Sequence, residues 1–346
     1  MTVIGWDIGG VNIKAARVRD HAPLAARNDP FEIQRAPASL AVRLEDIATA
    51  LGAEKSDEHA ITMTAELSQF FRTKRDGVVF VLDAVERAFP AARKFVYSVD
   101  GRFLDPGAAR GAPLLVAASN WSATASFVAS LVADAILIDV GSTTTDIIPI
   151  SRGRVVAIGR TDPERLLSGE LLYLGAVRTP VEAIVHLVPL RDGFAGVSAE
   201  SFALAGDIHV WRRDLPPEGY TTATPDTRPS TREFAGERIA RIVCADRELL
   251  DDSDLDRIAA FVADTMIARI AASIARVRER HPHLETAVIA GHGAFLARAA
   301  ARRAGLRVAP DDLLAPAAPR TVGAETAFAV ASLLERSLYT NVAPST

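Results

Sequence analysis

The segment ILIDVGSTTTDIIPI, residues 136–150, joins two strand-like apolar runs through a glycine, four consecutive hydroxyl residues and two aspartates. The segment IGWDIGGVNIKAARV, residues 4–18, follows the same order of residue types. One such hairpin is an ordinary turn, whereas two of them in one chain indicate an internal repeat. Alignment of the two segments pairs Asp7 with Asp139, Gly9 with Gly141, Gly10 with Ser142, Asn12 with Thr144 and Lys14 with Asp146. We therefore predict two related α/β domains that face a central cleft, each offering a tight turn to it.

The bulk composition is that of a globular protein with room for two domains: 346 residues, 49% of them hydrophobic and 24% charged. The net charge of −4 argues against a nucleic-acid partner. The single cysteine, Cys244, excludes an intrachain disulfide and favours a reducing compartment. There is no basic leader, and no apolar run approaches the roughly 20 residues of a membrane span. We expect a cytoplasmic protein with small-molecule partners, no membrane and no nucleic acid, and leave a homo-oligomer open.

Alternating strand and helix patterns predict an α/β arrangement in both halves of the chain. Predicted strands cover residues 2–10, 12–20, 60–64, 94–101, 136–150, 154–159 and 286–291. Predicted helices cover residues 39–51, 77–89, 119–134, 253–281, 294–304 and 324–338, and a proline-rich loop is expected over 206–231. Ser253 with Asp256 suggests a capping box at the start of the longest helix. The predicted domains are residues 1–134 and 135–320, with a terminal helix within 321–346 that packs back on the first domain.

The two turns have the chemistry of phosphate-binding loops. Glycine lets backbone N–H groups approach an anion, and polar side chains at the tip add hydrogen bonds. The candidate phosphate-binding residues in the turns are Gly9, Gly10, Asn12, Gly141, Ser142, Thr143 and Thr144. The carboxylates of Asp7, Asp139 and Asp146 would hold Mg²⁺ or orient a nucleophile, and Lys14 adds a positive charge. Asp7, Lys14 and Asp139 are therefore candidate catalytic residues. The alternative is a threonine-rich turn whose hydroxyls bond their own backbone.

A third glycine bend, in VIAGHGAFLARAA, residues 288–300, connects a predicted strand to a predicted helix. It places Gly291, Gly293 and Ala294 at a helix N-terminus, where backbone N–H groups favour an anion. Such a bend also occurs where a helix simply packs closely on a strand. We interpret His292 as a bend residue rather than a catalytic base.

These three elements, in this order, resemble the sugar kinase/heat-shock protein/actin superfamily. Within it, DVGSTTTDIIPI and AGHGA are similar to the hydantoinase A/oxoprolinase branch. The segments MTAELSQFFRTKRDGV, AASNWSATA, GAVRTPVEA, ESFALAGDIHVWRRDLPPEGY and TREFAGERIARIVCAD resemble short members of that branch linked to tetrahydromethanopterin-dependent one-carbon transfer. The resemblance covers nearly the whole chain. It implies two actin-like (ribonuclease H-like) domains.

The resemblance also implies an activity, because this subfamily includes the ether-forming synthase of methanofuran and methylofuran biosynthesis. Such a transferase displaces diphosphate from (5-aminomethyl-furan-3-yl)methyl diphosphate with the phenol oxygen of tyramine, tyrosine or a γ-glutamyl form. Mg²⁺ is the implied cofactor. The first loop, GGVNIK, departs from the hydroxyl-rich loop of the oxoprolinases, which disfavours ATP-driven ring opening. An ATP-dependent kinase, a hydantoinase/oxoprolinase-type amidohydrolase and a non-catalytic nucleotide-binding protein of the one-carbon pathway stay open as alternatives.

A phenol, with a pKa of about 10, needs a base or a cation that stabilises the phenolate. The segment ELSQFFRTKRDG supplies three candidates, Glu66, Lys74 and Arg75, although a solvated helix start is the alternative for this segment. Asn120 is a candidate polar contact to the substrate, and Trp121 is either a platform for its ring or a core residue. Arg178 would bind diphosphate or a glutamyl carboxylate, or cap a loop.

Overall fold

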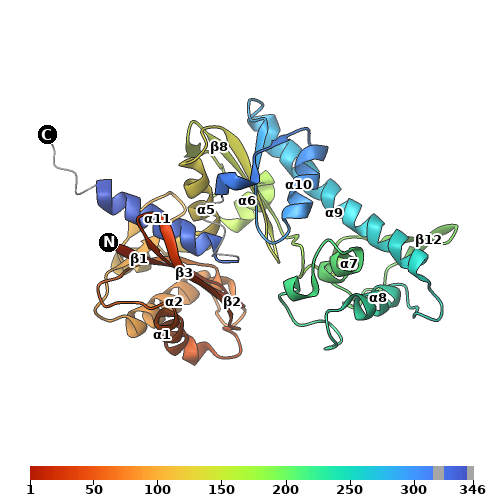
Figure 1. Cartoon of the computed structure of the whole chain (residues 1–346), viewed down its shortest axis with the longest axis horizontal. Coiled ribbons are helices and arrows are strands. Elements are labelled where there is room, and N and C mark those ends of the chain that lie inside the picture. Colours follow the sequence, from red (N-terminus) through yellow and green to blue (C-terminus); the bar gives the residue numbers. More distant parts are fainter. Residues whose placement is uncertain (315–322, 341–346) are drawn as a thin grey trace. The chain divides into compact units, whose positions relative to one another are not determined.

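The computed structural model describes residues 1–314 and 323–340, and the chain divides into two compact units (Figure 1). Unit 1 comprises Met1–Asp134, Ile150–Glu164 and Pro310–Thr346, and unit 2 comprises Ala135–Pro149 and Arg165–Ala309. Residues 150–164 and 310–314 thus belong to unit 1, although they were expected in the second domain, residues 135–320. For the first of these stretches the reason is that β9 (Arg154–Val155) packs against α5 (Asn120–Ala129). Residues 321, 322 and 341–346 of the predicted terminal segment lie outside the described residues.

Unit 1 is built on a six-stranded sheet of order β3-β2-β1-β4-β5-β6. β1 pairs antiparallel with β2 and parallel with β4, and β5 is parallel to β4. The strands are β1 (Thr2–Ile8), β2 (Asn12–Arg19), β3 (Ala22–Pro30), β4 (Glu58–Met63), β5 (Lys94–Tyr97) and β6 (Phe103–Leu104). The helices are α1 (Leu40–Ala50), α2 (Lys74–Ala88), α3 (Pro106–Gly111), α4 (Pro113–Val116), α5 and α11 (Glu325–Thr340).

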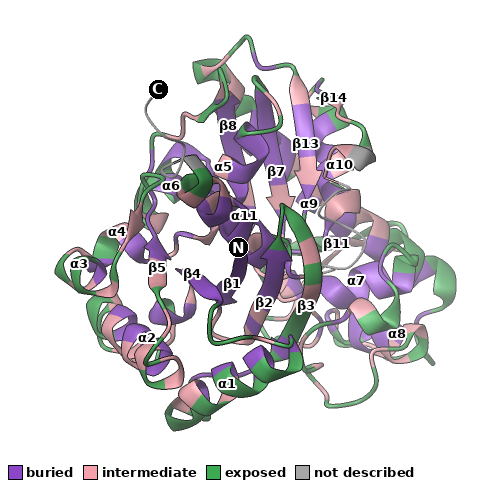
Figure 2. Ribbon diagram, turned by 60° about the vertical axis from the view of Figure 1, so that its left-hand side comes forward, coloured by how far each residue is buried: buried purple, intermediate pink, exposed green. Residues whose placement is uncertain are grey.

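Alternate residues of β1 point to opposite faces of this sheet, as the two-residue period of a strand requires. Trp6 and Ile8 join a core with residues of α1 and α2, whereas Val3 joins a core with residues of α5 and α11. Gly5 permits the close approach of α11, because a Cβ at this position would lie 1.9 Å from the carbonyl oxygen of Ala327. Figure 2 shows β1 buried along its length. The central strand of unit 1 is therefore covered on one face by the last helix of the chain.

Unit 2 has a sheet of order β10-β8-β7-β13-β14, and a separate hairpin of β11 and β12. The strands are β7 (Ala135–Val140), β8 (Thr145–Ser151), β10 (Leu171–Leu172), β11 (Leu187–Leu190), β12 (Gly193–Gly196), β13 (Thr286–Ala290) and β14 (Arg307–Val308). The helices are α7 (Ala205–Arg212), α8 (Arg232–Arg241), α9 (Asp252–Arg280) and α10 (Ala294–Arg303). β8 and α6 (Asp162–Ser168) run across the division between the units.

The two sheets repeat one topology. When strands are numbered within each unit, β10-β8-β7-β13-β14 and β3-β2-β1-β4-β5 both read 3-2-1-4-5. In each unit a tight turn joins strands 1 and 2, and strand 4 pairs parallel with strand 1. The predicted α/β class with two related domains is therefore confirmed.

Two local predictions in unit 2 are wrong. The expected loop over 206–231 begins with helix α7, whose residues are almost all buried. The N-cap of α9 is Asp251, whose side chain accepts a hydrogen bond from the backbone N–H of Asp254, and not Ser253. Among the described helices, α9 alone is long and apolar enough to cross a membrane by length and composition, but its stripe of Ile258, Met266 and Ile274 lies in the core of unit 2.

Candidate functional site

The two aligned turns have the same hydrogen bond. The backbone N–H of Gly9 donates to the carbonyl of Asn12 at 2.9 Å, and that of Gly141 donates to the carbonyl of Thr144 at 2.8 Å. Each turn follows the carboxyl end of the first strand of its sheet. The predicted repeat is therefore present at the level of individual turn residues. In the first turn, the carbonyl of Gly10 also accepts from Ile33 at 3.0 Å.

Asp7 and Lys14 form an ion pair in front of the first turn. The Lys14 Nζ lies 3.0 Å from the Asp7 Oδ2, and the two residues are cross-strand partners on β1 and β2. The Asp7 Oδ1 is buried and has no hydrogen-bond partner among the described residues. Burial of such an unpaired acceptor is unfavourable, so this oxygen is a suitable ligand for a cation.

Glu66 lies directly after β4, next to the first turn. The backbone N–H of Thr64 donates to the carbonyl of Ile8 at 2.9 Å, which ties the end of β4 to the end of β1. The Glu66 side chain is fully buried, and neither carboxylate oxygen has a hydrogen-bond partner among the described residues. Burial raises the pKa of Glu66 to about 7, and nearby Lys74 opposes this shift. Glu66 thus changes protonation state near neutral pH, but its oxygens do not reach solvent.

Lys74, at the start of α2, connects Glu66 to a residue that the sequence did not single out. Its Nζ lies 4.0 Å from the Glu66 Oε1 and 2.7 Å from the Asp162 Oδ2, and a quarter of its side chain is exposed. Asp162 follows Lys74 by 88 positions, so no local pattern could reveal the pair. Arg75 is exposed and has no ion pair within the described part of the chain.

The N-terminus of α5 lies beside the same strand end, because Ala117 forms a parallel bridge with Met63. Asn120 is half-buried, and its side-chain amide has no hydrogen bond to any described residue. Trp121 is 5% exposed, which leaves little of its ring available as a platform. The structure therefore brings Asp7, Lys14, Glu66, Lys74 and Asn120 to one edge of the unit 1 sheet, the carboxyl ends of parallel strands, where ligands bind in open α/β sheets.

In unit 2, the hydroxyl run divides into two parts. Ser142, Thr143 and Thr144 are half-buried, and none of their hydroxyls has a hydrogen bond within residues 1–314 and 323–340. The fourth hydroxyl, of Thr145, is buried and donates to the carbonyl of Leu174 at 2.6 Å. Three hydroxyl groups at the turn thus keep their hydrogen-bonding capacity for a ligand.

The loop after β10 packs against this turn. Backbone N–H groups of Val177 and Arg178 donate to the carbonyl of Ser142 at 3.1 and 2.8 Å, and that of Ala176 donates to Gly141 at 2.9 Å. Arg178 is half-buried, and its guanidinium forms no ion pair with a described residue. The residue that carries this positive charge is thus tied directly to the turn, through the hydrogen bond from its backbone N–H to Ser142.

The glycine bend after β13 lies next to Asp139, since Ala290 is the cross-strand partner of Asp139. Gly291 has a φ of +85°, and a Cβ there would lie 2.2 Å from the Asp139 Oδ1. The Gly293 N–H donates to the carbonyl of Val140 at 2.7 Å, and α10 begins at Ala294 without a side-chain cap. The His292 Nε2 lies 2.6 Å from the Gly219 carbonyl oxygen, which agrees with its interpretation as a bend residue.

The assignment of Asp146 as a metal ligand needs correction. The Arg165 Nη2 lies 2.5 Å from the Asp146 Oδ1, and the arginine side chain is almost fully buried. Because this carboxylate neutralises a buried guanidinium, it is poorly suited to a metal. No group of three or more His, Cys, Asp or Glu side chains in the described residues is placed to hold a metal ion. These residues fit Mg²⁺ only if it is bound by one carboxylate together with substrate phosphate oxygens. The Asp7 Oδ1 could be that carboxylate oxygen.

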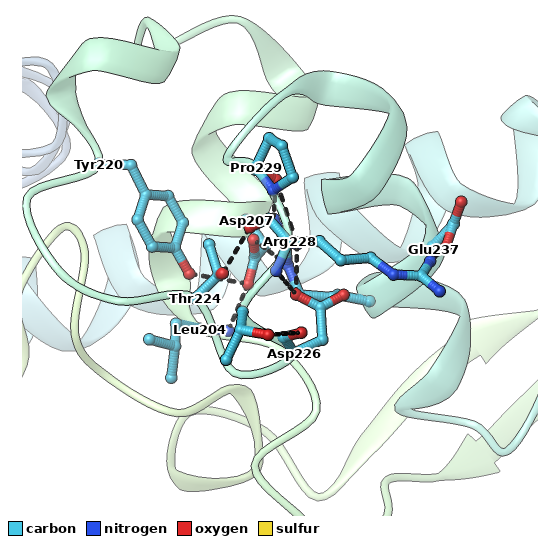
Figure 3. A network of polar contacts seen from close by, with 10 residues as sticks. Leu204, Asp207, Tyr220, Thr224, Asp226, Arg228, Pro229 and Glu237 are labelled. Carbon is cyan, nitrogen blue, oxygen red and sulfur yellow. Dashed lines mark hydrogen bonds and ion pairs between the residues drawn. The ribbon is translucent and has the colours of Figure 1, made fainter.

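A buried polar network supports the loops of unit 2 (Figure 3). The Arg238 Nε donates to the Asp207 Oδ1 at 2.7 Å, and the Tyr220 hydroxyl donates to the Asp207 Oδ2 at 3.1 Å. The Arg238 Nη1 also donates to the Asp226 Oδ1 at 3.0 Å. Burial raises the pKa of Asp207 to about 6, while the charge of Arg238 opposes the shift.

This network reaches the hydroxyl turn through the start of α7. The Ala205 N–H donates to the carbonyl of Thr179 at 2.7 Å, and the Gly206 N–H donates to Val177 at 3.0 Å. Asp207 holds this helix start, because it accepts from the Leu204 N–H at 2.8 Å. The network could not be predicted from the sequence, because its members lie in the segment expected to be loop and beyond it.

Three comparisons place the chain among known proteins. The profile of the hydantoinase/oxoprolinase family matches residues 57–336. A (4-{4-[2-(gamma-L-glutamylamino)ethyl]phenoxymethyl}furan-2-yl)methanamine synthase of Methanocaldococcus jannaschii is 33% identical over 344 residues, 97% of this chain and 98% of that protein. The synthase of the same name from Methanococcus vannielii is 36% identical over 158 residues, 46% of this chain and 70% of that protein. A glucokinase of Streptomyces griseus in complex with glucose and AMPPNP has a TM-score of 0.47 and 14% identity, covering 97% of this chain and all of that one.

Proposed function

The chain belongs to the hydantoinase/oxoprolinase family, and from this membership we propose that it is a synthase that joins a furanylmethyl group to a phenol oxygen with release of diphosphate. The named relatives are synthases, and one of them aligns with this chain over nearly its full length. The product in their name contains a phenoxymethyl group on a furan, which is an ether between a phenol oxygen and a furanylmethyl carbon. The chain is thus an enzyme of biosynthesis, and its substrates would be a furanylmethyl diphosphate and a phenolic amine.

The observation that carries the diphosphate assignment is the unpaired hydroxyl run of unit 2. Ser142, Thr143 and Thr144 have no hydrogen bond to a described residue, and the uncapped N-terminus of α10 follows the neighbouring strand. Arg178 adds a full positive charge. Hydroxyl and backbone N–H groups with an arginine stabilise phosphate oxygens, and most strongly as charge develops on a leaving group. Asp139 lies beside Gly291 at the same edge of the sheet.

Asp7 and Lys14 would bind phosphate oxygens at the first turn. Lys14 supplies positive charge near Gly9, Gly10 and Asn12. Mg²⁺, held by the Asp7 Oδ1 and by phosphate oxygens, would supply further charge neutralisation when bound. The furan ring stabilises the developing carbocation, so most of the required catalysis is stabilisation of the departing diphosphate.

The acceptor phenol would be activated at the Glu66–Lys74 pair. Lys74 is partly exposed and Glu66 ionises near neutral pH, which together supply a cation and a proton acceptor. Asn120 is the polar group at the same sheet edge that would contact the acceptor. We assign no role in this step to the exposed Arg75 or to the buried Trp121.

The test is diphosphate release from the furanylmethyl diphosphate with Mg²⁺, with and without a phenolic amine. γ-Glutamyltyramine, tyramine and tyrosine are compared as acceptors, and ATP hydrolysis is measured in parallel. Phenol-dependent release with ATP untouched supports the synthase. ATP consumption without ether formation would instead indicate a kinase or an amidohydrolase, and binding of a nucleotide without turnover would indicate a non-catalytic protein.

A matched pair of variants connects the assay to the site. Thr143→Val removes one hydroxyl of the turn at nearly constant shape, and Thr221→Val makes the same change on an exposed loop. We expect only the first to raise the KM for the furanylmethyl diphosphate.

We also propose a cytoplasmic location, in keeping with a single cysteine.

A further inference from the structure

Glu66 differs from every other described carboxylate, because both of its oxygens are buried and lack a hydrogen bond. A buried carboxylate whose nearest cation, the Lys74 Nζ, lies as far as 4.0 Å away is unfavourable for folding, so its presence next to a partly exposed lysine calls for a chemical reason. The Glu66 side chain has no exposed surface, and a substrate therefore cannot touch it in this arrangement. A direct general base would need an accessible oxygen.

Lys74 has the access that Glu66 lacks. A quarter of its side chain is exposed, and its Nζ lies between two carboxylates, 2.7 Å from Asp162 and 4.0 Å from Glu66. The ion pair with Asp162 fixes the ammonium group at the surface of this small cluster. One remaining N–H bond of the ammonium group can turn toward Glu66, which must approach from 4.0 Å to hydrogen-bond distance, and another can face an incoming substrate.

We propose that Lys74 contacts the acceptor phenol and relays its proton to Glu66, while Asp162 positions Lys74. This inference rests on the proposed synthase function. The ammonium group of Lys74 gives one proton to the Glu66 carboxylate and takes one from the phenol, so that its own charge is unchanged. The phenol oxygen then forms the C–O bond to the furanylmethyl carbon, and the bonding electron pair of the broken C–O bond leaves with diphosphate. Glu66 returns its proton to solvent through Lys74 after the ether has formed.

The relay also defines the class of acceptor. A phenol is a far stronger acid than an aliphatic alcohol, so it gives up its proton to such a relay much more readily. An aliphatic hydroxyl is nearly as weak an acid as water, so its proton transfer to an amine would be strongly unfavourable. The site is therefore matched to a phenol, and an aliphatic alcohol of similar size is expected to be a poor acceptor.

The charged groups that face Glu66 are Lys74 on α2 and Asp162 on α6, with opposite effects on its pKa. Lys74 lowers that pKa and Asp162 raises it. Removal of the lysine charge should therefore raise the pKa of Glu66, and removal of the Asp162 charge should lower it. Arg75, the exposed neighbour of Lys74, serves as the control, because no contact connects it to Glu66 among the described residues.

The first experiment needs no substrate. The Glu66 carboxyl carbon is followed by ¹³C NMR in glutamate-labelled protein as pH is varied, and it is assigned by its loss in Glu66→Gln. We expect its midpoint to rise in Lys74→Met, to fall in Asp162→Asn, and to stay unchanged in Arg75→Met. If the titration midpoint of Glu66 is the same in Lys74→Met as in wild type, the relay is overturned, whatever the enzyme catalyses.

The second experiment measures kcat/KM against pH with two acceptors. With tyramine, we expect Glu66→Gln and Lys74→Met to lose about 10²- to 10⁴-fold, and Glu66→Gln to lose the acidic limb of the profile. With a nitrophenol, assayed at a pH at which it is ionised, both variants should recover most of the rate that wild type has with the same acceptor. Equal losses with both acceptors would overturn the relay. If wild type releases no diphosphate with either acceptor, the proposed synthase function is wrong. The NMR experiment tests the coupling of Glu66 and Lys74 independently of that result.

Discussion

Glu66→Gln should make the protein more stable while it removes activity. In the folded chain, burial raises the pKa of Glu66 from 4.5 to about 7. A carboxyl whose pKa is raised by folding has no ionisation penalty below pH 4.5; the penalty grows as pH rises to 7 and is then constant. The shift of 2.5 pKa units corresponds to about 3 kcal/mol at pH 8.5 and about 1 kcal/mol at pH 5. Glutamine keeps the shape of the side chain and cannot ionise, so it avoids this penalty.

The assay is native-state hydrogen exchange of the amides of β1 and β4 at pH 5 and pH 8.5, which reports the opening free energy of unit 1 without assuming that both units unfold together. Glu45→Gln, on an exposed position of α1, is the control and should change stability by less than about 0.5 kcal/mol. A stability gain of the same size at both pH values would refute the reasoning, since only ionisation of Glu66 gives the difference. Loss of stability at pH 8.5 would show that its carboxylate has a favourable partner.

Three further outcomes are expected in unit 2. Thr143→Val should weaken the binding of inorganic diphosphate about 10- to 150-fold in calorimetry, since a hydrogen bond to a charged group contributes about 1.5–3 kcal/mol; unchanged affinity would assign the hydroxyl to turn structure. Gly291→Ala should destabilise unit 2 by at least about 1–2 kcal/mol in hydrogen exchange, because alanine is strained at a φ of +85° and its Cβ would meet Asp139. Arg238→Met should cost about 3–5 kcal/mol in thermal unfolding, because it leaves the Asp207 carboxylate buried and unpaired. The double variant Arg238→Met/Asp207→Leu should recover much of this loss, and no recovery would argue against a buried-charge origin.

The repeat and the fold class could be predicted from the sequence, because the signals that define them are local. Gly9 and Gly141 lie in turns whose residue order indicates the backbone path, and the apolar runs on either side are recognisable as strands in the sequence. Similarity extended this prediction to a family, which the profile match confirms.

The details that failed depend on residues far apart in the chain. Helix α7 lies in a proline-rich segment, but its start is held by Asp207, which is paired with Arg238. Asp146 occupies the position of Lys14 in the repeat, and only the fold reveals that Arg165 neutralises it. Composition alone gives no means of identifying either partner.

The candidate acceptor site shows the same limit. The sequence placed Glu66 in a charged segment, where a solvated side chain was the alternative interpretation. Its burial results from the packing of α2 and of the segment before α5 around the end of β4, which no periodicity in the segment itself reports. Asp162 joins the same cluster from the start of α6, a segment far from Glu66 in the sequence, through its ion pair with Lys74.

The covering of β1 by α11 has a consequence for synthesis of the protein. Roughly 190 residues separate the end of the first segment of unit 1, at Asp134, from the start of α11 at Glu325. At ribosomal rates of about 5–20 residues per second, this distance corresponds to about 10–40 s. During that interval the face of β1 that carries Val3 and Gly5 has no α11 to cover it, while all of unit 2 is already being made. The nascent chain must therefore keep an apolar sheet face exposed until its last helix leaves the ribosome, which makes this face a target for chaperones.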